Sequence, residues 1–320
     1  MNPQDADDWK HTKETLEWEL GVELCALLED PTVSDVMLNP DGKLFVERLG
    51  KPKMFFGNMD WVKAMAVIGT VAATMNTVIN SRNPILECEF PLDGSRFLAV
   101  IPPVTTGPHF TIRKKAIMVF TLADYVEQGV MTVWQREIIE TSVRMRDNIL
   151  IAGSTGSGKT TLTNAVMRYL VDSAPDHRLL ILEDTRELQC AAENAVSLKV
   201  MPGVDMILLV KTTMRENPDR ILVGEVRDGA AHALLKAWNT GHPGGVVTMH
   251  ANSAYAALTR MEQLVAEATI SPVPSLIAEA VNVVVFIAKH PCGRLVEEII
   301  RVTGHDGNKY LTESIGGSNV

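Results

Sequence analysis

One stretch of the chain combines residue types and spacing that suit phosphate chemistry: positions 148–170, NILIAGSTGSGKTTLTNAVMRYL. Its apolar residues 149–152 predict a buried strand, and the glycine-rich loop that follows leads into apolar residues at helical spacing. The spacing G-x-x-x-x-G-K-[ST] between a strand and a helix is the pattern of a phosphate-binding loop. A glycine-rich turn that matches by chance is the weaker alternative, because both flanking elements are present.

Each residue type in this loop has its own task in holding a nucleotide. Glycines allow backbone N–H groups to turn inward toward phosphate oxygens, and the helix N-terminus adds partial positive charge. Lys159 reaches the β- and γ-phosphates, and the Thr160 hydroxyl is suited to bind Mg²⁺. The predicted ligands are therefore ATP and Mg²⁺. The residues expected to bind the nucleotide are Gly153, Ser154, Thr155, Gly156, Ser157, Gly158, Lys159, Thr160 and Thr161.

Hydrolysis also needs a metal ion, a group that orients the attacking water, and positive charge on the γ-phosphate. Acidic residues follow two apolar strands, at the strand ends where nucleotides bind in open α/β sheets. Glu225 can polarise water or hold Mg²⁺ through water, and Gly224 before it permits a tight backbone turn. Glu183 can also hold Mg²⁺ through water. Whether Glu183 or its neighbour Asp184 is the functional group stays open.

A histidine ends another short apolar strand, 246–250, which follows the glycine-rich segment 239–245. From this position His250 can hydrogen-bond the γ-phosphate or a catalytic carboxylate. A lone histidine is more often structural, so its spacing alone leaves both interpretations open.

The order of elements predicts two domains. From the phosphate-binding loop onward, strands alternate with helices, which is typical of a RecA-like α/β core with a mostly parallel sheet. Before the loop, a helix over 9–28, a hairpin over 33–49, a helix over 59–79 and three further strands indicate a small α+β domain. The expected boundaries are 1–115 for the α+β N-terminal domain, 116–132 for a linker and 133–320 for the ATPase domain.

Composition restricts the possible partners. The formal charge of −9 and the 5% of aromatic residues argue against strong direct binding to nucleic acid. The four cysteines are scattered without a CxxC pair, as in a reducing compartment. No apolar signal segment is visible at the start, and the uncharged stretch after Lys63 contains enough polar residues to favour a buried helix over a membrane span.

Four short sequence boxes occur in order. They are the phosphate-binding loop at 153–161, the acidic box EDTRE at 183–187, NPDRILVGEVRD at 217–228 and the histidine box at 240–252. Together they resemble the secretion ATPase superfamily of type II secretion, type IV pili and conjugation systems. The third box carries Glu225 in place of the usual terminal Asp, as this superfamily does. The small N-terminal domain, without a tetracysteine zinc site, resembles the conjugation and type IV secretion branch.

The resemblance implies an activity and an assembly. Members hydrolyse ATP as homo-hexameric rings and turn hydrolysis into domain motion for mating-pair formation, pilus biogenesis and conjugative DNA transfer. The implied location is cytoplasmic, peripheral on the cytoplasmic face of the inner membrane, with inner-membrane components of the apparatus as partners. By the same resemblance, Arg96 and Arg113 of the N-terminal domain reach the phosphates, and Arg227 is a candidate interface residue. Arg215 and Arg260 are weaker candidates.

Three other functions share parts of this pattern. A RecA-type DNA translocase or helicase has the same core, but the negative charge and the acidic and histidine boxes disfavour it. A nucleotide-gated scaffold without hydrolysis is disfavoured by an intact Glu225. A small-molecule kinase is disfavoured because no acceptor site is evident and a whole domain precedes the loop. For the leading hypothesis the predicted catalytic residues are Glu225, Lys159, Glu183, His250, Arg96 and Arg113.

Overall fold

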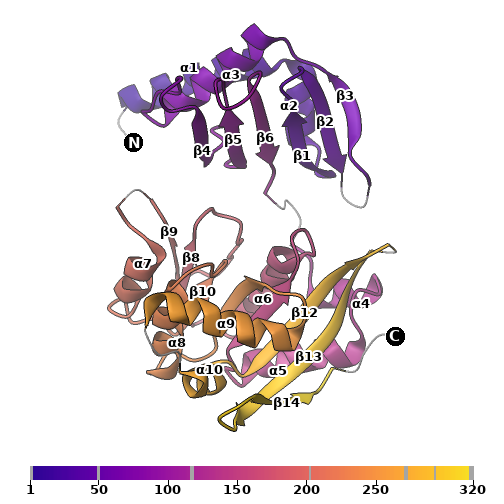
Figure 1. Cartoon of the computed structure of the whole chain (residues 1–320), viewed down its shortest axis with the longest axis vertical. Coiled ribbons are helices and arrows are strands. Elements are labelled where there is room, and N and C mark those ends of the chain that lie inside the picture. The colour runs from indigo at the N-terminus through magenta and orange to yellow at the C-terminus, as the bar shows by residue number, and fades with distance from the viewer. Residues whose placement is uncertain are drawn as a thin grey trace. The chain divides into compact units, whose positions relative to one another are not determined.

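The computed structural model describes residues 3–48, 51–115, 119–201, 203–269, 273–291 and 293–316. The chain forms two compact units, Met1–Met118 and Val119–Val320 (Figure 1). Each unit has its own sheet and hydrophobic core. Among the described helices, none combines the length and the apolar character needed to cross a membrane.

The first unit is a six-stranded antiparallel sheet that packs against helices on one face. The strand order is β3-β2-β1-β6-β5-β4. Val36, Phe97, Phe110 and Ile112 of the sheet share a buried cluster with Ile68 of a helix. The elements are α1 (Pro3–Leu20), α2 (Val22–Glu29), β1 (Val33–Leu38), β2 (Lys43–Arg48), β3 (Met54–Asn58), α3 (Trp61–Thr74), β4 (Ile85–Glu89), β5 (Arg96–Val100) and β6 (His109–Arg113).

The helix and hairpin expected near the start of the chain have different outcomes. The prediction of one continuous helix over 9–28 is wrong, because the chain breaks at Gly21, whose φ of +79° lies outside helical geometry. The hairpin between β1 and β2 is confirmed. Its Gly42 has a φ of +82° and donates its N–H to the carbonyl oxygen of Asn39 at 2.9 Å.

The next helix is shorter than the 59–79 that the sequence predicts. Asp60 caps its first turn by accepting the N–H of Lys63 at 2.9 Å, and Asn76 with a φ of +51° follows its last turn. Strand β3 is absent from the predicted elements. Its Met54 and Phe55 are exposed on the outermost strand, so no alternation of buried and exposed residues marks it.

The second unit confirms the RecA-like α/β prediction. Its eight-stranded sheet has the order β14-β13-β12-β7-β11-β10-β8-β9, and all neighbours from β12 to β9 are parallel. The elements are α4 (Leu122–Glu127), α5 (Val133–Arg144), β7 (Ile149–Gly153), α6 (Lys159–Ser173), β8 (Leu179–Glu183), β9 (Ala195–Lys199), α7 (Met206–Thr213), β10 (Arg220–Val223), α8 (Ala230–Asn239), β11 (Val246–His250), α9 (Ala254–Ala268), α10 (Pro274–Ala280), β12 (Val283–His290), β13 (Gly293–His305) and β14 (Tyr310–Ser314).

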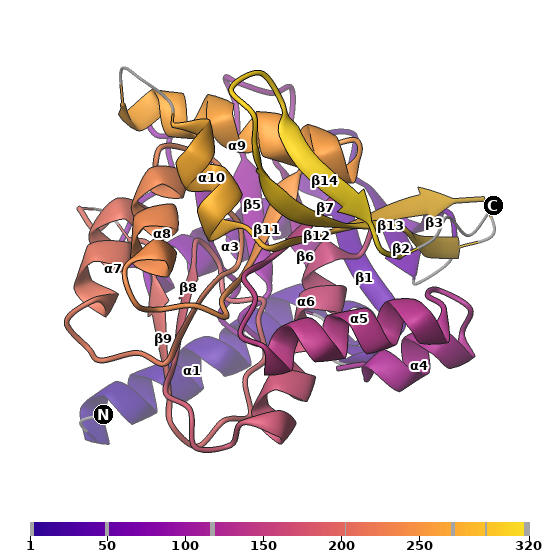
Figure 2. The same ribbon diagram turned by 90° about the horizontal axis from the view of Figure 1, so that it is seen from below.

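Helices cover both faces of this sheet. In β7, Ile149 and Ile151 pack into the cluster formed with α4 to α6, whereas Leu150 and Ala152 pack into the cluster formed with α7 to α10. Figure 2 shows these two helical layers on opposite sides of the strands. Because both faces of the sheet are buried, the sequences of β7 and β8 are continuous apolar runs. Because the strands are parallel, their carboxyl ends lie at the same edge of the sheet.

Positions 116–118 of the expected linker 116–132 lie outside the described residues. The later part of that linker contains the short helix α4, whose Leu122 and Tyr125 are buried in the core of the second unit. The last strand, β14, is absent from the predicted elements and pairs antiparallel with β13, with Tyr310 buried.

Candidate functional site

The phosphate-binding loop joins β7 to α6, as the sequence predicts. Gly153 ends the strand, and a Cβ atom there would lie 2.3 Å from the carbonyl oxygen of Ile287, so only glycine fits. Gly156 and Gly158 have φ values of +73° and +99°, a backbone region that favours glycine. Helix α6 begins at Lys159. The loop and the helix N-terminus therefore form a site suited to phosphate oxygens.

Lys159 is buried within the loop, with 7% exposure. Its Nζ donates to the carbonyl oxygens of Gly153 and Ser154, each at 3.0 Å, and lies 3.2 Å from Nδ1 of His250. Burial lowers the pKa of the Lys159 ammonium, and the attraction of Glu225 offsets part of that shift. These contacts fix the ammonium inside the loop.

The ring of His250, at the end of β11, lies between Lys159 and Glu225. Its Nε2 is 2.8 Å from Oε1 of Glu225. Because an ammonium can only donate, we assign Nδ1 as the acceptor, which places the proton of the neutral ring on Nε2. Burial and the neighbouring Lys159 lower the pKa of His250, which favours this neutral form. The structure therefore places His250 beside the loop and beside a carboxylate.

Glu225, just after β10, has a second partner in Arg227. Oε2 of Glu225 accepts from Nε of Arg227 at 2.7 Å and also contacts its Nη2. Nη1 of the same guanidinium lies 3.4 Å from Oδ2 of Asp184. Arg227 therefore links the acidic residues that follow β8 and β10 within one unit, and Asp184 faces this arginine.

Glu183 has a structural task at the end of β8. Its carboxylate is almost fully buried, and Oε1 accepts the backbone N–H groups of Glu187 and Leu188, each at 2.8 Å. Gly224 supports this arrangement by close approach, because a Cβ there would lie 3.0 Å from Cγ of Glu183. The φ of Gly224 is outside the left-handed region, so the expected tight turn is not the reason for this glycine.

The turn that Glu183 holds brings a different carboxylate to the loop. Oγ1 of Thr160 donates to Oε2 of Glu187 at 3.1 Å. Asn164 on the next turn of α6 donates to the carbonyl oxygen of Glu187 at 3.3 Å and accepts the N–H of Gln189 at 2.8 Å. Sequence reasoning includes Glu187 in the acidic box but does not single it out, because only the folded turn directs it toward Thr160.

Arg294 at the start of β13 is a second residue that sequence reasoning misses. Its Nε donates to the carbonyl oxygen of Gly156 at 3.3 Å, and a Cβ on Gly158 would lie 2.9 Å from its Cδ. The side chain therefore packs on the loop from a hairpin more than a hundred residues later. No local motif marks it, because its partners are backbone atoms distant in sequence.

Loss of this contact is expected to weaken nucleotide binding more than turnover. In Arg294→Ala, the loop loses one hydrogen bond to a charged donor, so KM for ATP rises about fivefold while kcat changes by less than about twofold. Steady-state hydrolysis against ATP concentration measures both constants. Lys289→Ala, an exposed cation on the same hairpin, is the matched control. An unchanged KM in Arg294→Ala would show that the contact does not support the loop.

Buried polar groups fix the histidine-box turn at the other end of the strands. Oδ1 of Asn148 accepts the N–H groups of Gly244 at 2.7 Å and Gly245 at 2.9 Å, and its Nδ2 donates to the carbonyl oxygen of Ala280 at 2.7 Å. Arg220, also buried, donates from Nη1 to the carbonyl oxygen of Gly244 at 3.1 Å. Satisfied groups of this kind hold the start of β11 in register with β7.

The same arginine makes stability depend on pH. Nε of Arg220 donates to Nδ1 of His177 at 3.1 Å, and burial together with this cation lowers the pKa of His177 from its usual 6.5. The unfolded chain therefore binds the proton more readily, so the contribution is present above about pH 6.5 and is lost as the pH falls below it. We expect His177→Gln to flatten the fall in unfolding temperature between about pH 7 and 5. An unchanged slope would contradict this.

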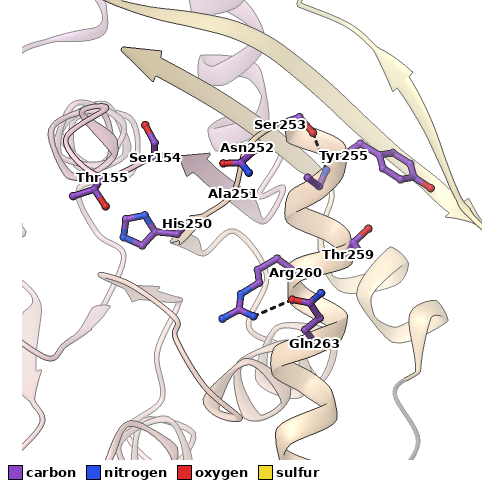
Figure 3. A pocket seen from close by; sticks show the side chains of 11 residues that line it. Ser154, Thr155, His250, Ala251, Asn252, Ser253, Tyr255, Thr259, Arg260 and Gln263 are labelled. Atoms are coloured by element: carbon purple, nitrogen blue, oxygen red, sulfur yellow. Dashed lines mark hydrogen bonds between the residues drawn. The ribbon is translucent and has the colours of Figure 1, made fainter.

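An open cavity of about 750 Å³ lies beside the loop and His250 (Figure 3). One wall comes from α9, where Arg260 donates to Oε1 of Gln263 at 2.9 Å. The cavity lies next to the loop at Ser154 and Thr155, so this side of the loop is open. The lining residues are Ser154, Thr155, His250, Ala251, Asn252, Ser253, Tyr255, Ala256, Thr259, Arg260 and Gln263.

The predicted site residues thus fall into two groups. Lys159, Thr160, Glu183, Glu225 and His250 meet at the carboxyl ends of β7, β8, β10 and β11 in the second unit.

The remaining predicted arginines lie elsewhere. Arg96 begins β5 and Arg113 ends β6, both in the first unit, so the second unit's site is described without them. Arg215 follows α7 and is exposed, and Arg260 lies on α9.

Comparison with known proteins agrees with this geometry. Residues 22–312 match the family model of the type II/IV secretion system protein. Conjugal transfer protein TrbB of Rhizobium radiobacter is 52% identical over 92% of this chain and 91% of its own length. Type IV secretion system protein VirB11 of Bartonella quintana is 29% identical over 76% of this chain and 79% of its own. The crystal structure of the pilus retraction motor PilT with bound ADP has a TM-score of 0.61 at 17% identity, covers 91% of this chain and 81% of its own, and supports the fold alone.

A phosphate-binding loop on a mostly parallel α/β sheet defines the class of P-loop nucleotide hydrolases. Within that class, the chain belongs to the type II/IV secretion system protein family, as a secretion ATPase of the TrbB and VirB11 type. The resemblance drawn from the four boxes, the fold class and the ATP hydrolase activity are thereby confirmed.

Proposed function

We propose that the chain works as a homo-hexameric ring on the cytoplasmic face of the inner membrane and powers a conjugation or type IV secretion apparatus. The proposed partners are inner-membrane components of that apparatus, with peripheral attachment to the membrane and without strong direct binding to nucleic acid. The proposed moving parts are residues 1–115 and 133–320, connected by 116–132. The 52% identity to a conjugal transfer protein supports the proposal that the apparatus is a conjugation system.

The observation that carries the proposal is the chain of contacts from the loop lysine to the carboxylate after β10. Lys159 contacts His250, and His250 contacts Glu225, at 3.2 Å and 2.8 Å. When ATP occupies the loop, Lys159 exchanges its carbonyl contacts for the β- and γ-phosphates. His250 then orients Glu225, whose carboxylate positions water for attack on the γ-phosphorus. The bond to the bridging oxygen breaks, and ADP and phosphate leave.

The residues near Thr160 fit a magnesium ion. Mg²⁺ prefers hard oxygen ligands and keeps several waters, and the Thr160 hydroxyl with the Glu187 carboxylate at 3.1 Å offers such oxygens at the loop. Thr160 is the proposed direct ligand, with Glu187 and Glu225 acting through water. Glu183 is proposed to act by holding the turn that carries Glu187. The ion would neutralise charge on the transferred phosphoryl group.

Positive charge from the first unit completes the proposed site. Arg96 and Arg113 are proposed to contact the phosphates as the γ-phosphoryl group is transferred. Positive charge at this place stabilises the transition state, and such electrostatic stabilisation is usually the largest contribution to the rate. Arg227 is proposed to hold Glu225 within one subunit. It is also proposed to lie at an interface with a neighbouring subunit. ATP-driven domain motion is the proposed output of hydrolysis.

The test of this function is genetic complementation with matched proteins. A strain that lacks the chromosomal or plasmid copy receives either the natural chain or Lys159→Ala, with both proteins at equal cellular levels. The natural chain restores conjugative transfer and Lys159→Ala does not. Native mass spectrometry of the purified chain with ATP is expected to give six subunits. Transfer by Lys159→Ala would contradict the motor role, and a stable monomer would contradict the ring.

A further inference from the structure

Four charged residues form a row across four strands of the first unit. Glu89 on β4 is directly opposite Arg96 on β5, Arg96 is opposite Arg113 on β6, and Arg113 is opposite Asp35 on β1. Residues directly opposite one another share a face of the sheet, so the order across that face is negative, positive, positive, negative.

The row lies on the face of the sheet that points away from the helices. The neighbours of its members along the strands, Val36, Phe97 and Ile112, are buried in the core with the helices. Successive side chains in a strand point to opposite faces, which places the charged row on the other side.

Two arginines directly opposite each other repel, yet the sheet keeps them in register. The carboxylates of Glu89 and Asp35, each opposite one of the arginines, offset this repulsion.

The bond at one end of the row is a well-formed ion pair. Nε of Arg113 donates to Oδ1 of Asp35 at 2.9 Å. The Asp35 side chain is 11% exposed, whereas that of Arg113 is 55% exposed. Separation of this pair would leave a carboxylate buried without its cation, which is strongly unfavourable. The pairing therefore persists while the exposed part of the arginine contacts other groups.

We propose that Asp35 is a positioning residue that holds the Arg113 guanidinium in the orientation it needs to contact the phosphoryl group. This inference rests on the proposed function of Arg113. Asp35 itself touches no nucleotide. Asp35 orients Arg113 through the ion pair. The oriented Arg113 is proposed to contact the phosphoryl group in the transition state, so the ion pair lowers the energy of that state.

The competing interpretation gives the opposite sign. If the Asp35 carboxylate held Arg113 away from the nucleotide, removal of the carboxylate charge would release the arginine and raise turnover. The burial of Asp35 favours the positioning role, because a releasable pair would leave that carboxylate uncompensated on every cycle.

A double-mutant cycle on the full chain tests the proposal. Asp35→Asn is expected to lower kcat about fivefold to tenfold and to change KM for ATP by less than about twofold. In the Arg113→Ala background, where kcat has already fallen about 100-fold, the same substitution changes kcat by less than about twofold. Thermal unfolding of all four proteins, with and without a non-hydrolysable ATP analogue, reports folding and binding separately from turnover.

Glu47→Gln is the matched control. Glu47 is opposite Asp35 on β2 and pairs with Lys53 at 3.8 Å, so it is the next carboxylate in the same row without the arginine partner. Its substitution is expected to leave kcat and KM unchanged.

The outcomes separate this inference from the proposed function. An equal loss of kcat from Asp35→Asn in both backgrounds assigns Asp35 a purely structural role and overturns the inference alone. A rise in kcat overturns it in favour of the holding role. If Arg113→Ala leaves kcat unchanged, the phosphate contact of Arg113 and this inference both fall.

Discussion

Replacement of Lys159 by alanine is expected to lower ATP turnover to background, a loss of at least about 100-fold in kcat. The Lys159 ammonium is the cation built into the loop, held between two carbonyl oxygens and His250. Arg294 contacts the loop only through the carbonyl oxygen of Gly156, so it does not take the place of the Lys159 ammonium at the β- and γ-phosphates.

The fold is expected to survive this change. Alanine suits the first turn of α6, and the substitution removes a charge whose pKa burial already lowers. Circular dichroism and the unfolding temperature should therefore match the natural chain within a few degrees. Lys211→Ala, an exposed lysine on α7, is the control with full activity. Turnover by a well-folded Lys159→Ala above about a tenth of the natural rate would contradict the role of the loop.

Glu225→Gln is expected to lower kcat about 100-fold or more and to leave KM for ATP nearly unchanged. The amide keeps the shape of the side chain, and its oxygen can still accept from His250 or Arg227. What it loses is the negative charge that polarises water. The substitution therefore separates nucleotide binding from chemistry, and a slowly hydrolysing ATP complex should accumulate.

Pre-steady-state measurement of phosphate release distinguishes the step affected by Glu225→Gln. The expected result is normal ATP binding followed by slow formation of phosphate. Glu267 is an exposed glutamate on α9, and Glu267→Gln is the control because it makes the same Glu-to-Gln substitution away from the loop. If Glu225→Gln keeps the natural rate of phosphate formation, the water-orienting group is a different residue, and Glu187 beside Thr160 is the next to examine.

Sequence reasoning succeeded where the signal is local. The glycines, Lys159 and Thr160 of the loop occupy adjacent positions, and their strand and helix follow from apolar spacing. Glu225 and His250 stand out in the sequence because each follows or ends an apolar strand, and parallel strands bring such ends together. The sequence leaves the contact between these two side chains as one of two possibilities for His250, since β10 and β11 become neighbours only in the folded sheet.

Other parts of the site depend on partners distant in the chain. Asp35 and Arg113 are 78 positions apart, and only the register of β1 with β6 pairs them. Arg294 reaches the loop through the β12–β13 hairpin, and its acceptor is a backbone carbonyl that carries no sequence signal. Asn148 supports the histidine box through backbone N–H groups nearly a hundred positions away. Side-chain-to-backbone contacts of this range leave no pattern in a single sequence.

Steady-state ATP hydrolysis by the purified chain, with and without single-stranded DNA, tests the central claim most directly. The account predicts turnover without DNA, loss of that turnover in Lys159→Ala, and less than about a twofold change when DNA is added, since the chain carries a formal charge of −9 and only 5% of its residues are aromatic. Turnover that appears only with single-stranded DNA would contradict a motor coupled to protein partners and would favour a DNA translocase.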